Sequence, residues 1–203
     1  MNWKDWMQQI DEALFISIHQ AGSHEFLDVF MLLMRNALTW VPLYLFVLFY
    51  IIRYRKNKAL IFLVCTLITF AIADYGSASI LKPMFQRLRP CFNEDLQGHL
   101  RNLIECGGRY GFPSSHASNH FALATFWFLS LRSIGIRRWW WVWVWALVIG
   151  YAQVYVGKHY PLDIVGGAMY GFLVGWLISR LFIWWNQSGF RLIRPNRRLD
   201  ALT

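Results

Sequence analysis

Charged residues are scarce in this chain of 203 residues. Asp, Glu, Lys and Arg together make up 15% of the sequence, against roughly 25% in soluble globular domains, while hydrophobic residues reach 57%. Long apolar stretches alternate with short basic clusters, which is the pattern of membrane spans and loops rather than of one large soluble core. This scarcity excludes an ordinary soluble protein and predicts an integral membrane protein with a single domain.

Acidic residues are scarcer than basic ones. The chain has 11 Asp and Glu against 20 Lys and Arg, which gives a net charge of +9. The basic residues stand at the ends of apolar runs, where they anchor a membrane protein at its cytoplasmic edge, so we expect no nucleic-acid partner. The carboxylates do not cluster as Mg²⁺ ligands do, so we expect no metal and no other cofactor. The first residues lack the apolar run and the cleavage site of a removable signal peptide.

The apolar runs predict an all-α fold, a bundle of about five transmembrane helices with six as the alternative, in one domain over residues 1–203. Residues 1–35 are too polar to cross a bilayer and are expected to form one or two amphipathic helices at its interface. The other expected segments are spans at 38–53, 59–81, 115–131, 139–157 and 162–185 within a core of residues 36–185, a polar connection at 82–113 and a basic cytoplasmic tail at 186–203.

The distribution of Lys and Arg predicts the orientation of the bundle. Five spans bring three basic groups to one side of the membrane, and the positive-inside rule makes that side the cytoplasm. The connection 82–113 and the turn 158–161 then lie together on the outer face. The three groups are Arg53, Arg55, Lys56 and Lys58; Arg132, Arg137 and Arg138; and Arg191, Arg194, Arg197 and Arg198 in the tail.

Small and polar residues inside the spans predict how the helices pack. Gly167, Gly171 and Gly175 recur every four residues in the fifth span, which predicts close approach to another helix. Asp74, Ser77 and Ser79 lie within the second span, and we expect them to face other helices rather than lipid.

The first segment with candidate functional residues contains Lys82 and Arg89. These residues are seven positions apart, so on a helix they would lie within about 20° of each other on one face. Two aligned cations suit an anion with several oxygens, and arginine adds a bidentate fork. A pair of charges that reach from a helix end to the membrane surface is the alternative.

Two further segments stand at the outer ends of spans. Ser114 is a candidate N-cap of the third span, and a helix N-terminus binds anions, so His116 would stand beside the bound anion. Pro161 suits the first turn of the fifth span, with His159 just before it and Asp163 inside it. A carboxylate at this spacing accepts the proton of one imidazole nitrogen and makes the other the better nucleophile. An unrelated surface histidine beside a helix-start aspartate is the alternative.

Taken together, the three segments resemble the type 2 phosphatidic acid phosphatase (PAP2) superfamily, whose pattern is Lys-x6-Arg-Pro, then Pro-Ser-x-His, then His-x3-Asp. The resemblance implies that His159 attacks phosphorus and forms a phosphohistidine, oriented by Asp163. It implies that His116 protonates the departing oxygen and later activates water. Lys82 and Arg89 would hold the phosphate oxygens, and the backbone N–H groups around Ser114 and Ser115 would join them.

The sequence departs from that family at two positions. The family has an arginine six residues before the nucleophilic histidine, where this chain has Gln153, so one phosphate-binding cation is missing. Gln153 can still donate a hydrogen bond, and we hypothesise that Arg109 supplies the missing charge. Ser115 stands where glycine is usual, and a backbone conformation with positive φ would be strained there.

The remaining cysteines and histidines carry weaker signals. Cys91 and Cys106 both lie in the connection 82–113, where an oxidising outer face would allow them to form a disulfide, with two free thiols as the alternative. His120 follows His116 by four residues and is expected to pack beside the site. The other histidines, His19, His24 and His99, show no partner pattern and are expected to be solvated or interfacial.

The favoured function is a metal-independent phosphatase of membrane lipid phosphates or diphosphates, with polyprenyl diphosphate, phosphatidic acid and phosphatidylglycerol phosphate as the substrate classes. The expected location is the bacterial inner membrane, with the site facing the periplasm or exterior. The expected partners are the bilayer and the lipid substrate, and the oligomeric state stays open. A phosphotransferase between lipids would use the same residues and stays open, as does a non-catalytic membrane protein with a vestigial site.

Overall fold

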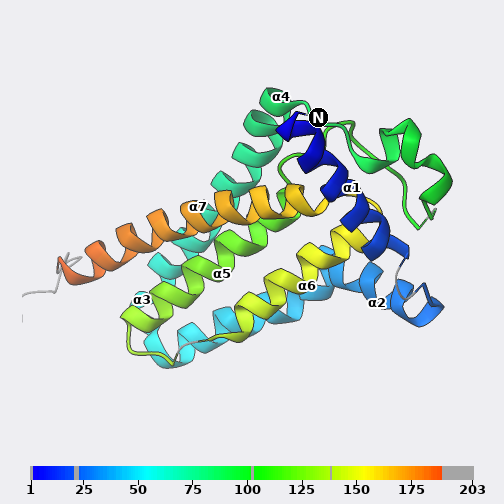
Figure 1. The fold of residues 1–203 in the computed structure, drawn as a ribbon. Helices are drawn as coiled ribbons and strands as arrows, with labels where there is room; N and C mark the ends of the chain where they lie inside the picture. Colours follow the sequence, from blue (N-terminus) through cyan, green and yellow to red (C-terminus); the bar gives the residue numbers. More distant parts are fainter. Residues whose placement is uncertain (1, 21–22, 102, 138, 189–203) are drawn as a thin grey trace, which may run out of the picture.

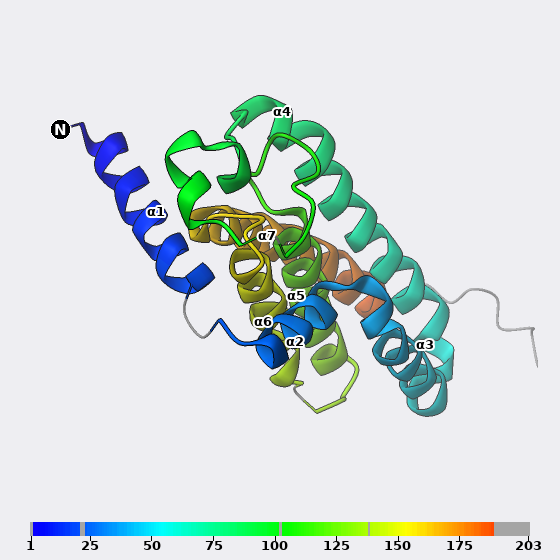
Figure 2. The same ribbon diagram turned by 90° about the vertical axis from the view of Figure 1, so that its right-hand side faces the viewer.

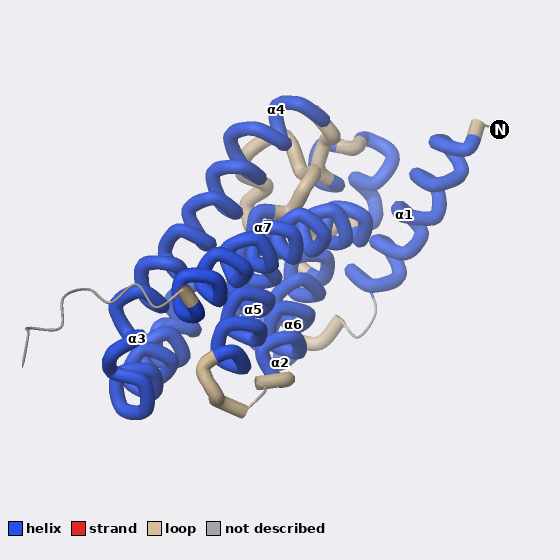
Figure 3. Tube along the Cα trace, turned by 90° about the vertical axis from the view of Figure 1, so that its left-hand side faces the viewer, coloured by secondary structure: helices blue, strands red, loops and turns tan. Residues whose placement is uncertain are grey.

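The computed structural model describes residues 2–20, 23–101, 103–137 and 139–188. Over these residues the fold is helical, and a lone antiparallel bridge between Leu88 and Tyr110 is the only strand-like pairing (Figure 3). The α-helices are α1 (Trp3–Gln20), α2 (Glu25–Arg35), α3 (Val41–Tyr75), α4 (Lys82–Phe85), α5 (Ser115–Ser133), α6 (Trp141–Tyr155) and α7 (Pro161–Gln187). The shorter elements are η1 (Ala37–Trp40), the π-helix η2 (Gly76–Leu81), η3 (Pro90–Phe92) and η4 (Glu94–His99).

Helix α3 consists of two arms that correspond to the first two predicted spans. Arg55 interrupts the helix with φ −144° and ψ 48°, and the chain reverses direction at this point (Figures 1 and 2). The Arg55 side chain fixes the bend, because its Nε donates to the carbonyl of Ile134 at 2.7 Å. By length and apolar composition, Ala37–Phe85 and Pro161–Gln187 qualify as candidate spans. The count of about five spans stays a prediction.

Helix α5 is the centre of the bundle, and its side chains are buried on nearly every face. It packs most extensively against α7. A Cβ atom added at Gly167, Gly171 or Gly175 would come closer than 3.0 Å to a backbone carbonyl oxygen of α5 or its cap, so only glycine permits this approach. The predicted role of these three glycines in helix packing is confirmed.

The polar residues at the end of α3 and in η2 are only partly internal. Ser77 is buried, and Asp74 accepts a hydrogen bond from the Asn119 amide at 2.8 Å. Ser79 is exposed, so the expectation that it faces another helix is wrong. Ser79 lies in the π-helix η2, whose buried residues are Gly76 and Ser77.

The two ends of the bundle differ in character (Figure 1). One end collects α4, the connection between α4 and α5, the starts of α5 and α7 and the end of α6. The opposite end holds the bend of α3 and the link between α5 and α6, which carry Arg53, Arg55, Arg132 and Arg137. Arg138 and the four arginines of the tail lie outside the described residues. Which end faces the outside stays a prediction.

The two N-terminal helices pack on the first of these ends. His19 of α1 is buried; its Nδ1 lies 2.7 Å from the Tyr155 carbonyl, and its Nε2 accepts the Arg101 backbone N–H at 2.8 Å. Asp28 of α2 accepts hydrogen bonds from the Tyr155 hydroxyl at 2.6 Å and from the Arg101 guanidinium at 2.8 Å. These contacts tie α1 and α2 to α6 and to the connection. An interfacial position for residues 1–35 stays a prediction.

The expectation that the three remaining histidines are solvated or interfacial is wrong for His19, which is buried, whereas His24 and His99 are exposed. His19 is a buried tether, the His24 ring accepts the Phe26 backbone N–H as the N-cap of α2, and the His99 ring lies 3.3 Å from the Gln20 amide. The partners of His19 and His99 are distant in sequence, which is why spacing along the chain did not reveal them.

Candidate active site

His159 and Asp163 form the centre of the site, and the start of α7 positions both. Pro161 opens the helix, and the Asp163 carboxylate accepts the Tyr160 backbone N–H at 3.1 Å, which fixes its rotamer. Oδ2 of the same carboxylate lies 3.3 Å from Nδ1 of His159, and the imidazole is 2% exposed. Burial lowers the pKa of His159 to about 4, so the ring is neutral near pH 7 with its Nδ1 proton held by Asp163.

Arg89 lies against the other nitrogen of that ring. Its Nη1 is 3.2 Å from Nε2 of His159, and it also donates to the Lys158 carbonyl at 3.3 Å. The Arg89 Nε–H donates to the Gly108 carbonyl, and the side chain is buried. An oxyanion bound to Arg89 would therefore lie directly at the lone pair of His159 Nε2.

Lys82 approaches the same region, but not from a helix shared with Arg89. Helix α4 ends at Phe85 because Gln86 adopts the left-handed conformation with φ 51°, and Arg89 precedes a proline in extended backbone. The expected alignment of Lys82 and Arg89 on one helical face is wrong. The Lys82 ammonium donates to the carbonyls of Gly111 and Pro113 at 2.9 and 2.7 Å, and burial, with the charge of Arg89, lowers its pKa to about 8.

The Pro-Ser-x-His segment begins α5 beside these residues. Ser114 is the N-cap, its hydroxyl accepts the Ala117 N–H, and its own N–H donates to the Asp163 carbonyl at 2.9 Å. The start of α5 is thereby tied to the start of α7. His116 is half-buried, and its ring is stacked with that of His120 at 6.4 Å between centroids. His116 and His159 are close enough for a charge on one ring to affect the other. His120 packs on Trp145, as expected of a packing residue.

Ser115 is the first residue of α5. Among the described non-glycine residues only Gln86 has positive φ, so Ser115 does not. The expected strain at Ser115 is therefore absent. Its hydroxyl oxygen is buried and has no hydrogen-bond partner within the described residues.

Gln153 supports the nucleophile through its backbone. Its carbonyl accepts the N–H groups of Lys158 and His159 at 3.0 and 3.2 Å, across a turn in which Gly157 has φ 82°. Its side-chain amide is fully buried, and neither polar atom has a partner among the residues described. The Arg109 side chain is exposed, and no hydrogen bond or ion pair of the described residues connects it to the site. The role hypothesised for Arg109 stays a prediction.

An ion-pair network behind Asp163 was missed from the sequence. The Arg87 guanidinium donates to Asp163 Oδ1 at 2.8 Å and to Asp11 Oδ2 at 2.6 Å, and it stacks on the Tyr160 ring at 4.4 Å. Burial raises the pKa of Asp11, and the Arg87 charge opposes that rise. The signal available in the sequence was a third cation, Arg87, inside the Lys-x6-Arg segment; nothing local pointed to Asp11.

The connection over the site is closed by a disulfide between Cys91 and Cys106, whose Cα atoms are 6.0 Å apart. The two ends of the connection pair through backbone hydrogen bonds, from the Arg89 N–H to the Arg109 carbonyl and from the Gly111 N–H to the Arg87 carbonyl. The Lys158 ammonium donates to the Glu105 carbonyl at 2.9 Å and joins the tip of the connection to the turn before His159. The disulfide therefore braces the segment that carries Arg87 and Arg89.

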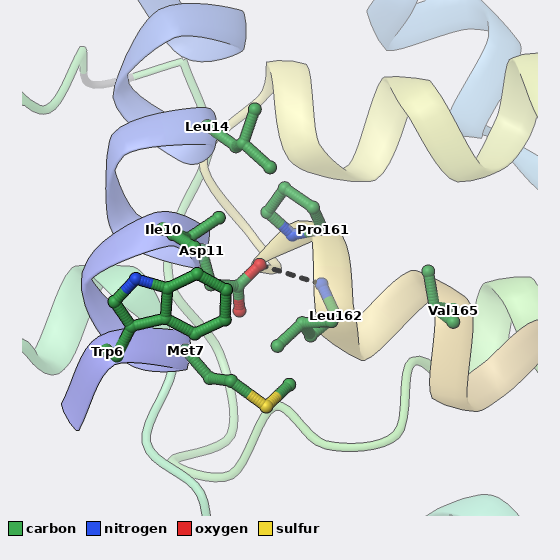
Figure 4. Close-up of a pocket in the computed structure, with 8 residues that line it drawn as sticks. All are labelled: Trp6, Met7, Ile10, Asp11, Leu14, Pro161, Leu162 and Val165. Carbon is green, nitrogen blue, oxygen red and sulfur yellow. Dashed lines mark hydrogen bonds between the residues drawn. The ribbon is translucent and has the colours of Figure 1, made fainter. Parts of the chain in front are cut away.

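An apolar groove of about 300 Å³ lies beside the start of α7 (Figure 4). Its walls come from one face of α1 and the first turns of α7. Asp11 spans the groove and accepts the Leu162 backbone N–H at 2.9 Å. The lining residues are Trp6, Met7, Ile10, Asp11, Leu14, Pro161, Leu162 and Val165. The groove thus presents apolar surface next to Asp163. The described residues include no group of three or more His, Cys, Asp and Glu arranged to hold a metal.

Comparisons with known proteins find similarity over most of the chain. Residues 58–187 match the model of the PAP2 superfamily. The chain is 34% identical to the lipid A 4'-phosphatase of Bacteroides thetaiotaomicron over 179 residues, covering 85% of this chain and 77% of that protein. It is 28% identical to the lipid A 4'-phosphatase of Porphyromonas gingivalis, covering 89% and 76% respectively. A phosphatidylglycerolphosphate phosphatase from Bacillus subtilis has a similar fold, with a TM-score of 0.64, 21% identity and coverage of 93% of this chain and 89% of the other.

Proposed function

Because the chain belongs to the PAP2 superfamily and is a membrane lipid phosphatase, we propose that it removes a phosphate monoester from lipid A through a phosphohistidine on His159. The observation that carries the mechanism is the pair of contacts on one buried imidazole, with Asp163 at Nδ1 and Arg89 at Nε2. The substrate class is supported by the two lipid A 4'-phosphatases, which resemble this chain over most of its length.

Binding of the phosphate would reorganise the contact between Arg89 and His159. In the structure the Arg89 guanidinium occupies the side of the ring from which Nε2 attacks. Phosphate oxygens are stronger acceptors for a guanidinium than a neutral imidazole is, so a bound phosphate takes this donor and leaves the Nε2 lone pair facing phosphorus. The Lys82 ammonium and the free N–H groups at the start of α5 neutralise the remaining oxygens.

In the first chemical step, Nε2 of His159 forms a bond to phosphorus as the bond from phosphorus to the lipid oxygen breaks. The imidazolium that develops keeps its Nδ1 proton on Asp163, and Arg87 holds that carboxylate from behind. The departing oxygen takes a proton from His116, whose protonated form is favoured by the bound phosphate dianion. The dephosphorylated lipid then leaves.

In the second step, His116 accepts a proton from water, and the oxygen of that water attacks phosphorus. The bond between phosphorus and Nε2 breaks, orthophosphate is released, and His159 returns to its neutral form. If a lipid took the place of water as the acceptor, the enzyme would be a phosphotransferase. Release of free phosphate in the absence of any added lipid acceptor would exclude this alternative.

The outer face of the membrane is the proposed side for this chemistry. The site and the connection lie at one end of the bundle, and the described basic groups lie at the other, which the positive-inside rule assigns to the cytoplasm. The residues at the ends of the helices would then be level with lipid headgroups, and the apolar groove beside α7 would face the acyl chains.

The test of this function is phosphate release from a panel of lipids in detergent. We expect the purified protein to release orthophosphate from bisphosphorylated lipid A in EDTA, with mass spectrometry showing the loss of one phosphate from the distal sugar. The alternative substrates are undecaprenyl diphosphate, phosphatidic acid and phosphatidylglycerol phosphate, and preferential turnover of one of these would replace the lipid A assignment. Activity that requires added Mg²⁺ would contradict the metal-independent mechanism.

The reaction should also lose efficiency at alkaline pH because Lys82 loses its charge. Its folded pKa is lowered from 10.5 to about 8, so the ammonium is present below pH 8 and is lost above it. The phosphate monoester has its second pKa near 6 and does not titrate in this range. We expect kcat/KM to fall above about pH 8, because this quantity reports the free enzyme. Lys82→Arg keeps its charge, so its lower activity should stay level from pH 8 to 10; an unchanged alkaline decline in this variant would rule out Lys82 as the group.

A further inference from the structure

Position 153 leaves the proposed site with a buried amide where a cation is expected. The Gln153 side chain is fully buried, and its two polar atoms have no partner among the described residues. A phosphate dianion bound by Lys82 and Arg89 would face the uncharged Gln153 on the α6 side of the site. This inference rests on the proposed function.

Arg35 is the cation that the fold brings to this side. It is the last residue of α2, and it follows Asp28 and Met31 by seven and four residues, so the three side chains share one face of the helix. Asp28 bonds the Tyr155 hydroxyl at 2.6 Å, and Met31 packs in a buried cluster with Ala152, Tyr155 and Val156. That face therefore lies against α6 on either side of Gln153 in the sequence (Figure 2).

The chain beyond α2 packs on the wall of the site. Trp40 in η1 contacts the Trp145 ring edge-on at 5.8 Å between centroids. Trp145 in turn contacts the ring of His120 at 4.9 Å, one helical turn after His116. Arg35 is thus bracketed along the chain by Met31, which faces the end of α6, and by Trp40, which faces the residues beside His116.

The Arg35 guanidinium lacks the partner that a partly buried cation normally has. Its Nε is buried and unpaired, and none of the ion pairs formed by the described residues involves Arg35. Burial lowers the pKa of Arg35 itself, and its charge contributes to the lowered pKa values of Arg89 and Lys158. His116 lies within range of the same charge. A partly buried cation among other cations is unfavourable unless an anion binds between them.

We propose that Arg35 binds the phosphate of the substrate and supplies, from α2, the positive charge that Gln153 does not. The contacts of Asp28 with Arg101 and Tyr155 hold α2 in the position that this requires. The N-terminal segment is then part of the phosphate-binding site and not only a membrane-interface element.

The test uses orthovanadate, a phosphate analogue, as the probe. In detergent we expect Arg35→Gln to weaken inhibition by orthovanadate by about 10- to 100-fold, the effect of losing one hydrogen bond to a charged group, and to lower kcat/KM by a similar factor. Introducing Gln153→Arg into Arg35→Gln should restore at least about tenfold of the vanadate affinity. Arg132→Ala removes an exposed cation at the opposite end of the bundle and should leave both quantities unchanged.

Two controls separate binding from folding and from the lipid reaction. Met31→Ala removes packing on the same face of α2, so it should lower the unfolding temperature while the stabilisation by vanadate is retained. Stabilisation by vanadate also measures anion binding when no lipid is hydrolysed. If the wild type hydrolyses none of the lipids but its stabilisation by vanadate still requires Arg35, the proposed function fails and this inference stands. A folded Arg35→Gln variant that binds vanadate as tightly as the wild type would overturn the inference.

Discussion

Replacing His159 by alanine is expected to lower kcat for lipid dephosphorylation by at least about 10⁴-fold, because the reaction loses the atom that bonds to phosphorus. The imidazole is buried between Asp163 and Arg89, and within the described part of the chain no second histidine has a carboxylate partner at the site. Substrate affinity should change much less, since Lys82 and Arg89 remain. The measurement is the initial rate of phosphate release, with KM determined for the residual activity.

His99→Ala is the matched control for His159→Ala. His99 is exposed at the end of η4, and its ring contacts the Gln20 side chain, so its loss should leave kcat near the wild-type value. If the His159→Ala variant, folded and purified to the same standard, retained a tenth or more of the wild-type rate, His159 would not be the nucleophile.

Replacing Arg87 by methionine is expected to cause the second largest loss. The guanidinium separates two carboxylates, Asp11 and Asp163, and is the only cation of the described residues that forms an ion pair with either. Its removal takes away the donor to Asp163 Oδ1, one of the contacts that hold this carboxylate against Nδ1 of His159. We expect kcat to fall by about 10²-fold with little change in KM, and the free energy of unfolding to fall by about 3–5 kcal/mol, as for other broken buried ion pairs.

The controls distinguish positioning of Asp163 from general destabilisation. Asp11→Asn removes the ion pair to α1 but keeps the bond between Arg87 and Asp163, so its loss of kcat should be much smaller than that of Arg87→Met. Arg87→Lys keeps the charge without the two-sided fork and should recover part of the rate. Equal losses of kcat in Asp11→Asn and Arg87→Met would assign the effect to the docking of α1 and not to Asp163.

The parts of the site that the sequence predicted depend on short-range spacing. Ser114 caps a helix, Pro161 begins one, and the four-residue interval from His159 to Asp163 places carboxylate against imidazole; each signal acts within a few residues. The same is true of the basic run at Arg53–Lys58, which marks the bend in α3. These features are fixed by local physics, and the structure contains them.

The parts that were missed depend on contacts between distant segments. Asp11 meets Arg87 and Leu162 only after α1 docks on α7, and the role proposed for Arg35 depends on the packing of α2 on α6. The seven-residue spacing of Lys82 and Arg89 suggested one helix through both residues, but the local sequence prevents it. Gln86 ends α4, and Pro90 keeps Arg89 extended. The hypothesis for the missing cation named Arg109 because it is close in sequence to Ser114, whereas the cation proposed above, Arg35, belongs to the N-terminal segment.

The central claim is that phosphate is carried on Nε2 of His159, and rapid quenching of the reaction tests it most directly. With ³²P-labelled lipid substrate, the wild type should acquire label within the first turnover, and peptide mapping should locate it on His159 as a linkage that is stable in alkali and labile in acid. His159→Ala should acquire none. A wild-type enzyme that releases phosphate without ever carrying label, or that carries it on another residue, would contradict this account.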